Sequence, residues 1–194
     1  LVPRLVTGAF DPERHKAVWP STGNYCRGGA FDSVILGCAA VAVLPQDMSR
    51  ERFAWLADIG AEVIATPGSE SNVKEIYDKV RELRADAVNR ILNQFEEPGN
   101  YRFHFHCTAH AAQEVVDSLG FHAAAFVSAM GSAGTIAAGE GLRRHHPGMP
   151  IVALEPVQCP TLYNAGFGGH RIEGIGDKHV TWIHNVWATD LLVC

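Results

Sequence analysis

The stretch Ala129-Met130-Gly131-Ser132-Ala133-Gly134-Thr135 joins two segments of different character. Before it, the apolar run from Ala123 to Val127 predicts a buried strand, and after it residues 136–144 have the pattern of a helix. A small-residue loop between a strand and a helix N-terminus is a natural anion site, because the first N–H groups of a helix lack partners and the helix dipole favours negative charge there. We therefore expect a phosphate group on this loop.

The side chains of the loop support that interpretation. Gly131, Ala133 and Gly134 let the backbone approach a phosphate closely, and Ser132 and Thr135 can add hydroxyl donors. The loop is not a Walker loop, since no Gly-Lys-Ser/Thr follows it, and its third glycine is misplaced for the dinucleotide fingerprint. A tight turn that needs small residues only for packing is the alternative.

Composition excludes several classes of protein. The 194 residues are 47% hydrophobic and 19% charged, which is globular composition and gives an ample core. A net charge of −5 without a long Lys/Arg cluster argues against a nucleic-acid partner. No apolar run reaches membrane-spanning length and no signal-peptide pattern is present, so we expect no membrane partner. Five scattered cysteines without a CxxC pair favour a reducing, cytoplasmic compartment.

Short apolar runs alternate with amphipathic segments along most of the chain. This alternation predicts an α/β protein with parallel sheets and helices on both faces. Besides the strand at 123–127, strands are expected at 40–44, 62–66, 91–95, 151–155 and 180–186. Helices are expected at 27–38, 49–60, 71–83 (with Ser71 as a cap) and 101–119.

The same pattern suggests two lobes. Pro98-Gly99-Asn100 is the best candidate linker. We therefore expect a leader segment without assigned structure at 1–19, a small αβα lobe at 20–98 and part of a larger αβα lobe at 99–194. The glycine-rich run 166–176 predicts a loop that either lines a cleft or simply lies at the surface.

A second polar turn opens the first predicted helix. The hydroxyls of Ser21 and Thr22, the backbone of Gly23 and the amide of Asn24 together suit a carboxylate ligand and a ring oxygen. A helix cap is the alternative interpretation of this turn.

A group of histidines could suggest a metal. His104, His106 and His110 flank Cys107, and His106 and His110 share one face if the segment is helical, as in a zinc site. A fourth ligand is not evident, and histidines on an amphipathic helix usually pack or face water. We therefore predict no metal.

The order of these motifs resembles that of a known family. The Ser-Thr-Gly-Asn turn is followed by the runs 44–52 and 56–63, the small-residue loop, Glu155-Pro156 and Gly174-Ile175-Gly176. From about residue 20 to about residue 185 the chain is similar to the fold-type II pyridoxal-phosphate enzymes, the cysteine synthase and cystathionine β-synthase group. The resemblance implies a two-lobed fold like that of the tryptophan synthase β subunit, and a homodimer. It also implies a pyridoxal-phosphate lyase or transferase that performs β-elimination or β-replacement on an amino acid.

The resemblance also implies a role for each motif. It assigns the cofactor phosphate to Gly131, Ser132, Ala133, Gly134 and Thr135. It assigns the pyridoxal ring hydroxyl to Asn24. It assigns the substrate and its carboxylate to Ser21, Thr22, Gly23, Tyr25, Gly174, Ile175 and Gly176.

Some positions depart from the family pattern. The order Ser21-Thr22 is reversed, and Tyr25 stands where a threonine is usual, which puts the substrate's identity in doubt. Ala133 replaces a glycine, and we expect the loop to tolerate it only if its φ is negative.

The largest departure concerns lysine. The chain has four, Lys16, Lys74, Lys79 and Lys178, and none stands where the family carries its Schiff-base lysine, well upstream of the Ser/Thr-Gly-Asn turn. We expect that lysine before Leu1 and the pyridine-nitrogen partner past Cys194, so that the chain is a fragment. The alternative is a non-catalytic domain that binds a phosphorylated ligand or a partner protein.

Overall fold

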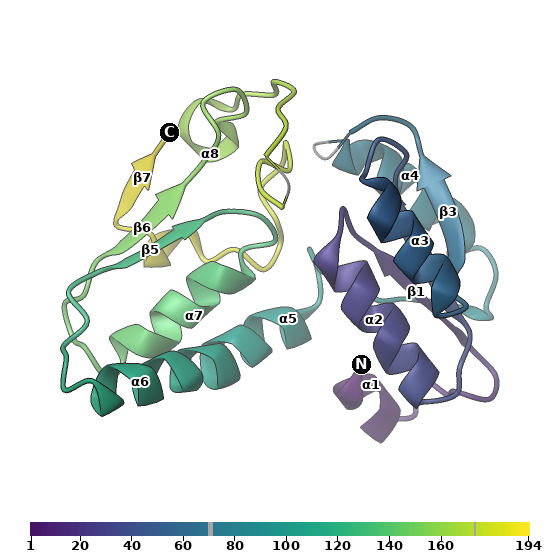
Figure 1. Cartoon of the computed structure of the whole chain (residues 1–194), viewed down its shortest axis with the longest axis horizontal. Helices are drawn as coiled ribbons and strands as arrows, with labels where there is room; N and C mark the ends of the chain where they lie inside the picture. Colours follow the sequence, from purple (N-terminus) through teal and green to yellow (C-terminus); the bar gives the residue numbers. More distant parts are fainter. Residues whose placement is uncertain (70–71, 173) are drawn as a thin grey trace. The chain divides into compact units, whose positions relative to one another are not determined.

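The computed structural model describes residues 1–69, 72–172 and 174–194. These residues form two compact units, 1–94 and 95–194, each with its own parallel sheet. Figure 1 shows the first unit in purple to blue and the second in teal to yellow. We describe each unit by itself.

The first unit is built on a four-stranded parallel sheet in the order β3-β2-β1-β4. Parallel neighbours need crossover connections, and the helices α2, α3 and α4 supply them. The elements are α1 (Val2–Val6), β1 (Lys16–Pro20), α2 (Asn24–Ile35), β2 (Ala40–Pro45), α3 (Arg50–Asp58), β3 (Glu62–Thr66), α4 (Val73–Leu83) and β4 (Asn89–Ile91).

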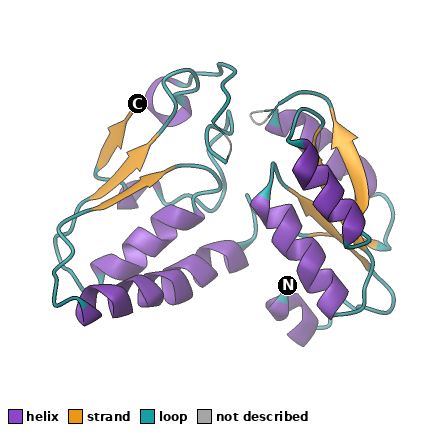
Figure 2. Cartoon of the chain, viewed as in Figure 1, coloured by secondary structure: helices purple, strands orange, loops and turns teal. Residues whose placement is uncertain are grey.

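Alternation along β1 builds a three-layer core in this unit. Ala17 and Trp19 belong to the cluster that includes Ala30 of α2 and residues of α3, whereas Val18 packs with Ile76 of α4. Helices therefore cover both faces of the sheet, as Figure 2 shows, which confirms the predicted αβα arrangement here.

The second unit contains a three-stranded parallel sheet in the order β5-β6-β7. The buried residues Met130, Ile136, Ile151 and Ala153 pack α7 against it. In Figure 1, α7 lies beside the long helical segment formed by α5, a π-helical turn and α6. The elements are α5 (Pro98–Phe103), η1 (His104–Thr108), α6 (Ala109–Ser118), β5 (Phe126–Ala129), α7 (Gly134–Arg143), β6 (Ile151–Leu154), α8 (Thr161–Asn164), η2 (Val186–Ala188) and β7 (Leu191–Val193).

Two expectations about the chain's organisation were wrong. The segment 1–19 is not a structureless leader, because β1 pairs with both β2 and β4; its short apolar core after His15-Lys16 gave too weak a periodic signal. Pro98-Gly99-Asn100 is not a linker but the start of α5, since proline suits the first helical position, where its missing N–H costs no bond.

Strand bounds also shifted. Residues 180–186 alternate but form no strand; Asn185 instead accepts a hydrogen bond from Trp187 N (3.2 Å) and begins the 3-10 turn η2. The strand predicted at 123–127 begins at Phe126, and the one predicted at 91–95 ends at Ile91. The expected cap Ser71 lies outside the described residues. Within the described residues, the structure holds no helix that is both long and apolar enough to cross a membrane.

Candidate functional site

The loop that opened the sequence analysis connects β5 to the N-terminus of α7. No side chain caps α7, so the N–H groups of its first turn have no capping partner and are suited to an anion. The expectation for Ala133 was wrong, because its φ is +68°, in the left-handed region. An alanine there costs about 1–2 kcal/mol, and the fold holds it at the mouth of the helix.

Neighbouring side chains fix the shape of this loop. Asn100 Nδ2 donates to Ser132 Oγ (3.0 Å), and Thr135 Oγ1 donates to the carbonyl of Ala129 (3.2 Å). A Cβ on Gly134 would stand 2.5 Å from Cδ2 of His104, so this helix position accepts only glycine without a shift. The sequence did not single out Asn100, whose position three residues into α5 carried no motif.

The glycine segment predicted to line the site packs directly on the loop. Gly176 N donates to the carbonyl of Met130 (3.2 Å), and a Cβ on Gly131 would stand 2.5 Å from the carbonyl oxygen of Gly174. Asp177 follows at once, and its carboxylate is buried beside Gly131, with 7% of the residue exposed. Sequence reasoning missed Asp177; its signal was a lone acid after a glycine run.

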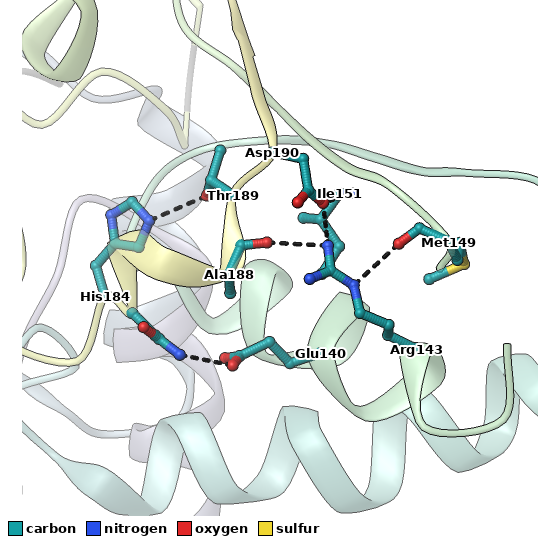
Figure 3. A network of polar contacts seen from close by, with 9 residues as sticks. Glu140, Arg143, Met149, Ile151, His184, Ala188, Thr189 and Asp190 are labelled. Atoms are coloured by element: carbon teal, nitrogen blue, oxygen red, sulfur yellow. Dashed lines mark hydrogen bonds and ion pairs between the residues drawn. The ribbon is translucent and has the colours of Figure 1, made fainter. Parts of the chain in front are cut away.

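A polar network fastens the end of the chain to α7 (Figure 3). Asn185 Nδ2 donates to Glu140 (2.7 Å), whose other oxygen accepts from the Tyr101 hydroxyl (2.6 Å). Arg143 donates to the carbonyl of Ala188 (3.1 Å) and pairs with Asp190. The segment after Asp177 is thus held on the same helix whose N-terminus forms the loop.

The carboxylate turn of the first unit is equally well supported. Ser21 Oγ accepts hydrogen bonds from Gly23 N (3.1 Å) and from Gln94 Nε2 (3.0 Å). Gln94 follows β4, the neighbour of β1, so its amide meets the turn at the carboxyl edge of the sheet. Sequence reasoning missed Gln94, although a polar residue directly after a strand next to the turn is the usual signal.

A guanidinium lies behind this turn. Arg52 Nη1 donates to the carbonyl of Thr22 (2.6 Å), and Cys26 Sγ donates to the carbonyl of Gly23 (2.9 Å). Burial raises the pKa of the Cys26 thiol to about 12, so the thiol stays a neutral donor. Both contacts orient the carbonyls of the turn inward and leave its N–H groups and hydroxyls for a ligand.

The last two residues of the turn differ in direction. Asn24 is exposed and makes no side-chain hydrogen bond to the described residues, so its amide is open to a ligand. The Tyr25 ring packs edge-on against Trp19, with 5.5 Å between centroids. The bulk of Tyr25 is therefore taken up by the core.

Three of the four lysines are committed to ion pairs in the first unit. Lys16 contacts Glu62 (3.1 Å), Lys74 pairs with Asp78 and Lys79 with Glu82. The fourth, Lys178, has φ +58° and follows Asp177 in the second unit.

The histidines do not gather around one point. His104 Nδ1 bonds Thr108 Oγ1 (3.0 Å), whereas His110 contacts Glu114 (3.5 Å) and His106 is exposed. Among the described residues, no group of three or more His, Cys, Asp or Glu side chains could hold a metal ion. Burial lowers the pKa of His104 below its ordinary value, which keeps the ring neutral beside the phosphate loop.

The two turns thus lie at comparable places in their units. Each follows a strand of a parallel sheet and opens a helix: β1 and α2 in one unit, β5 and α7 in the other. Crevices at the carboxyl ends of parallel strands are where open α/β sheets bind ligands.

Comparison with known proteins places the chain in a family. The sequence profile described as "Pyridoxal-phosphate dependent enzyme" matches residues 4–186. A cysteine synthase of Staphylococcus aureus is 34% identical over 177 residues, which cover 91% of this chain and 56% of that protein. The chain spans about half the length of the curated relatives it matches.

Solved structures agree. A hydrogen sulfide-producing enzyme from Fusobacterium nucleatum has a TM-score of 0.89 at 25% identity and covers 100% of this chain and 64% of that one. O-acetylserine sulfhydrylase isoform 3 from Entamoeba histolytica has a TM-score of 0.83 at 28% identity, covering 98% and 56%. The chain belongs to the pyridoxal-phosphate-dependent enzyme family, with the α/β fold of its cysteine synthase members.

Proposed function

We propose that the protein performs pyridoxal-phosphate-dependent β-elimination or β-replacement on an amino acid, as a cysteine synthase-like lyase or transferase. The observation that carries the proposal is the uncapped N-terminus of α7 behind Gly131–Thr135, a cradle of backbone N–H groups that fits the cofactor phosphate. The names of the matched cysteine synthases support the reaction type. Nothing in these comparisons favours the non-catalytic alternative.

The chain's own residues would divide the work between two lobes, 20–98 and 99–194. In the second, the loop and Gly174–Gly176 hold the phosphate end. In the first, Asn24 holds the ring hydroxyl, and Ser21–Gly23 with Tyr25 hold the substrate carboxylate. Gln94 joins this set, because its amide already bonds Ser21 Oγ. When bound, the cofactor supplies an electron sink for charge at the substrate's α-carbon.

Two further features belong to the proposal. We expect a cytoplasmic protein, because its five cysteines are free among the described residues, and a homodimer, as the family resemblance implies. Light scattering after size exclusion measures the dimer.

Borohydride reduction tests the proposal in the natural full-length protein. We expect a visible absorbance band after incubation with pyridoxal phosphate, its loss on reduction, and a covalent adduct on one lysine by mass spectrometry. Peptide mapping then shows whether that lysine is Lys16, Lys74, Lys79, Lys178 or another. Protein that binds the cofactor only non-covalently, or not at all, would contradict the proposal.

A further inference from the structure

Two acidic side chains are buried among the described residues, Glu155 and Asp177. Glu155 has a structural role, because its carboxylate accepts hydrogen bonds from the backbone N–H groups of Leu162 (2.8 Å) and Tyr163 (3.1 Å). Asp177 lies elsewhere, beside the loop that is proposed to hold a phosphate. A negative charge next to an anion site weakens anion binding, so its presence there calls for a chemical reason.

The backbone holds Asp177 in this position. Gly176 and Lys178, on either side of it, have φ of +75° and +58°, and for a lysine that conformation costs about 1 kcal/mol. The Asp177 Oδ2 atom lies 3.6 Å from the point where a Cβ on Gly131 would stand. Beyond it, Thr181 Oγ1 donates to the carbonyl of Ser132 (3.1 Å), so the turn is tied to the loop at both ends.

We propose that Asp177 is the general base of the reaction and selects a neutral nucleophile, water, for the β-carbon of the substrate. This inference rests on the proposed function. A carboxylate within reach of the nucleophile can accept its proton as the new bond forms. It was left unused by the cofactor and carboxylate sites described above.

The choice of water over a thiol follows from acidity and charge. A thiol ionises with a pKa near 8.5, so its anion is available near neutral pH without help from the protein. Water, with a pKa of about 15.7, needs a base. The carboxylate also repels a thiolate or hydrosulfide anion, whereas it attracts the O–H of water.

The step balances without another reactant. A β-substituted alanine loses its substituent X with the bonding electron pair, and the water oxygen supplies the electron pair of the new C–O bond. The water proton passes to the Asp177 carboxylate and from there to X. The net reaction converts a β-substituted alanine and water into serine and HX.

The test compares wild type with Asp177→Asn in the natural full-length protein. Each is given a β-substituted alanine in H2(18)O with and without sulfide, and labelled serine and cysteine are counted. We expect Asp177→Asn to lose at least tenfold in labelled serine while cysteine formation persists. Independently of turnover, it should bind pyridoxal phosphate about threefold more tightly in a fluorescence titration, because a like charge near the phosphate is gone.

Asp117→Asn is the matched control, because Asp117 is an exposed acid of the same unit that bonds only Gln113 (2.7 Å). It should match wild type in both assays. An unchanged serine-to-cysteine ratio in Asp177→Asn, or unchanged cofactor affinity, would overturn the inference while leaving the proposed function intact. Wild-type protein that forms no borohydride-trapped adduct would overturn both.

Discussion

The guanidinium of Arg52 fills the space that a side chain at position 23 would need. A Cβ on Gly23 would stand 2.5 Å from Arg52 Nη1, and the same Nη1 donates to the carbonyl of Thr22 (2.6 Å). Gly23 and Arg52 are therefore one structural device, since the glycine admits the cation that orients the turn. Hydrogen bonds to charged groups contribute about 1.5–3 kcal/mol, enough to hold a short turn.

Gly23→Ala and Arg52→Ala should each weaken substrate binding by about tenfold, because either change releases the Thr22 carbonyl. Global stability should fall less, since the far end of Arg52 can move. The substrate dissociation constant and urea unfolding measure the two effects. The double variant should bind no worse than the weaker single variant, because both act through one contact. Additive losses would show that the two residues act separately.

Gly134→Ala should disrupt the phosphate loop. Its Cβ would meet His104 at 2.5 Å and Asn100 Oδ1 at 2.9 Å, and such overpacking costs about 1–3 kcal/mol. We expect a lower unfolding midpoint and weaker pyridoxal-phosphate binding. Gly99→Ala is the matched control, since Gly99 lies in α5 with nothing within 4 Å of a Cβ, and it should leave both unchanged or raise stability slightly. Equal effects of the two changes would refute this account.

Ala133→Gly should stabilise the protein. Relief of the left-handed alanine (φ +68°) is worth about 1–2 kcal/mol, against about 0.4–1 kcal/mol lost to the greater freedom of glycine in the unfolded chain. The expected net gain is about 0.5–1 kcal/mol in urea unfolding. Ala137→Gly is the control: this buried alanine lies inside α7, so glycine should destabilise there. A loss of stability in Ala133→Gly would show that its conformation is not strained.

Sequence patterns predicted what depends on near neighbours. The strand and helix flanking Gly131–Thr135 were found because the apolar run, small residues and helical pattern are contiguous, although β5 begins at Phe126. β1 was missed because only residues 17–20 carry its signal and the strand is defined by pairing with β2 and β4.

The supporting contacts of the site were beyond sequence reasoning. Gln94 meets Ser21 across 73 positions, and Asp177 meets Gly131 only after the glycine run folds back on the loop. No local pattern encodes such pairs, because they follow from the order of strands in each sheet. The sign of φ at Ala133 was predicted wrongly for the same reason: tertiary contacts, rather than alanine's own preference, decide it.

Acid should destabilise the second unit through three buried imidazoles. Burial lowers the pKa of His104, His179 and His184 below the ordinary value of 6.5, so the folded state keeps them neutral while the unfolded chain takes up protons. Stability from these groups is complete above about pH 6.5 and is lost as pH falls toward their folded pKa values. Each histidine can contribute at most about 1.4 kcal/mol per pH unit.

Urea unfolding at pH 7.5 and pH 5.5 measures this loss. His104→Gln should reduce the difference between the two pH values, because one imidazole no longer takes up a proton on unfolding. The values at pH 7.5, where both states hold neutral rings, separate any packing loss from the protonation effect. The pH difference should shrink again when His184→Gln is added, since the two rings share no contact among the described residues. A stability that rises on acidification would mean that these rings become charged in the folded protein.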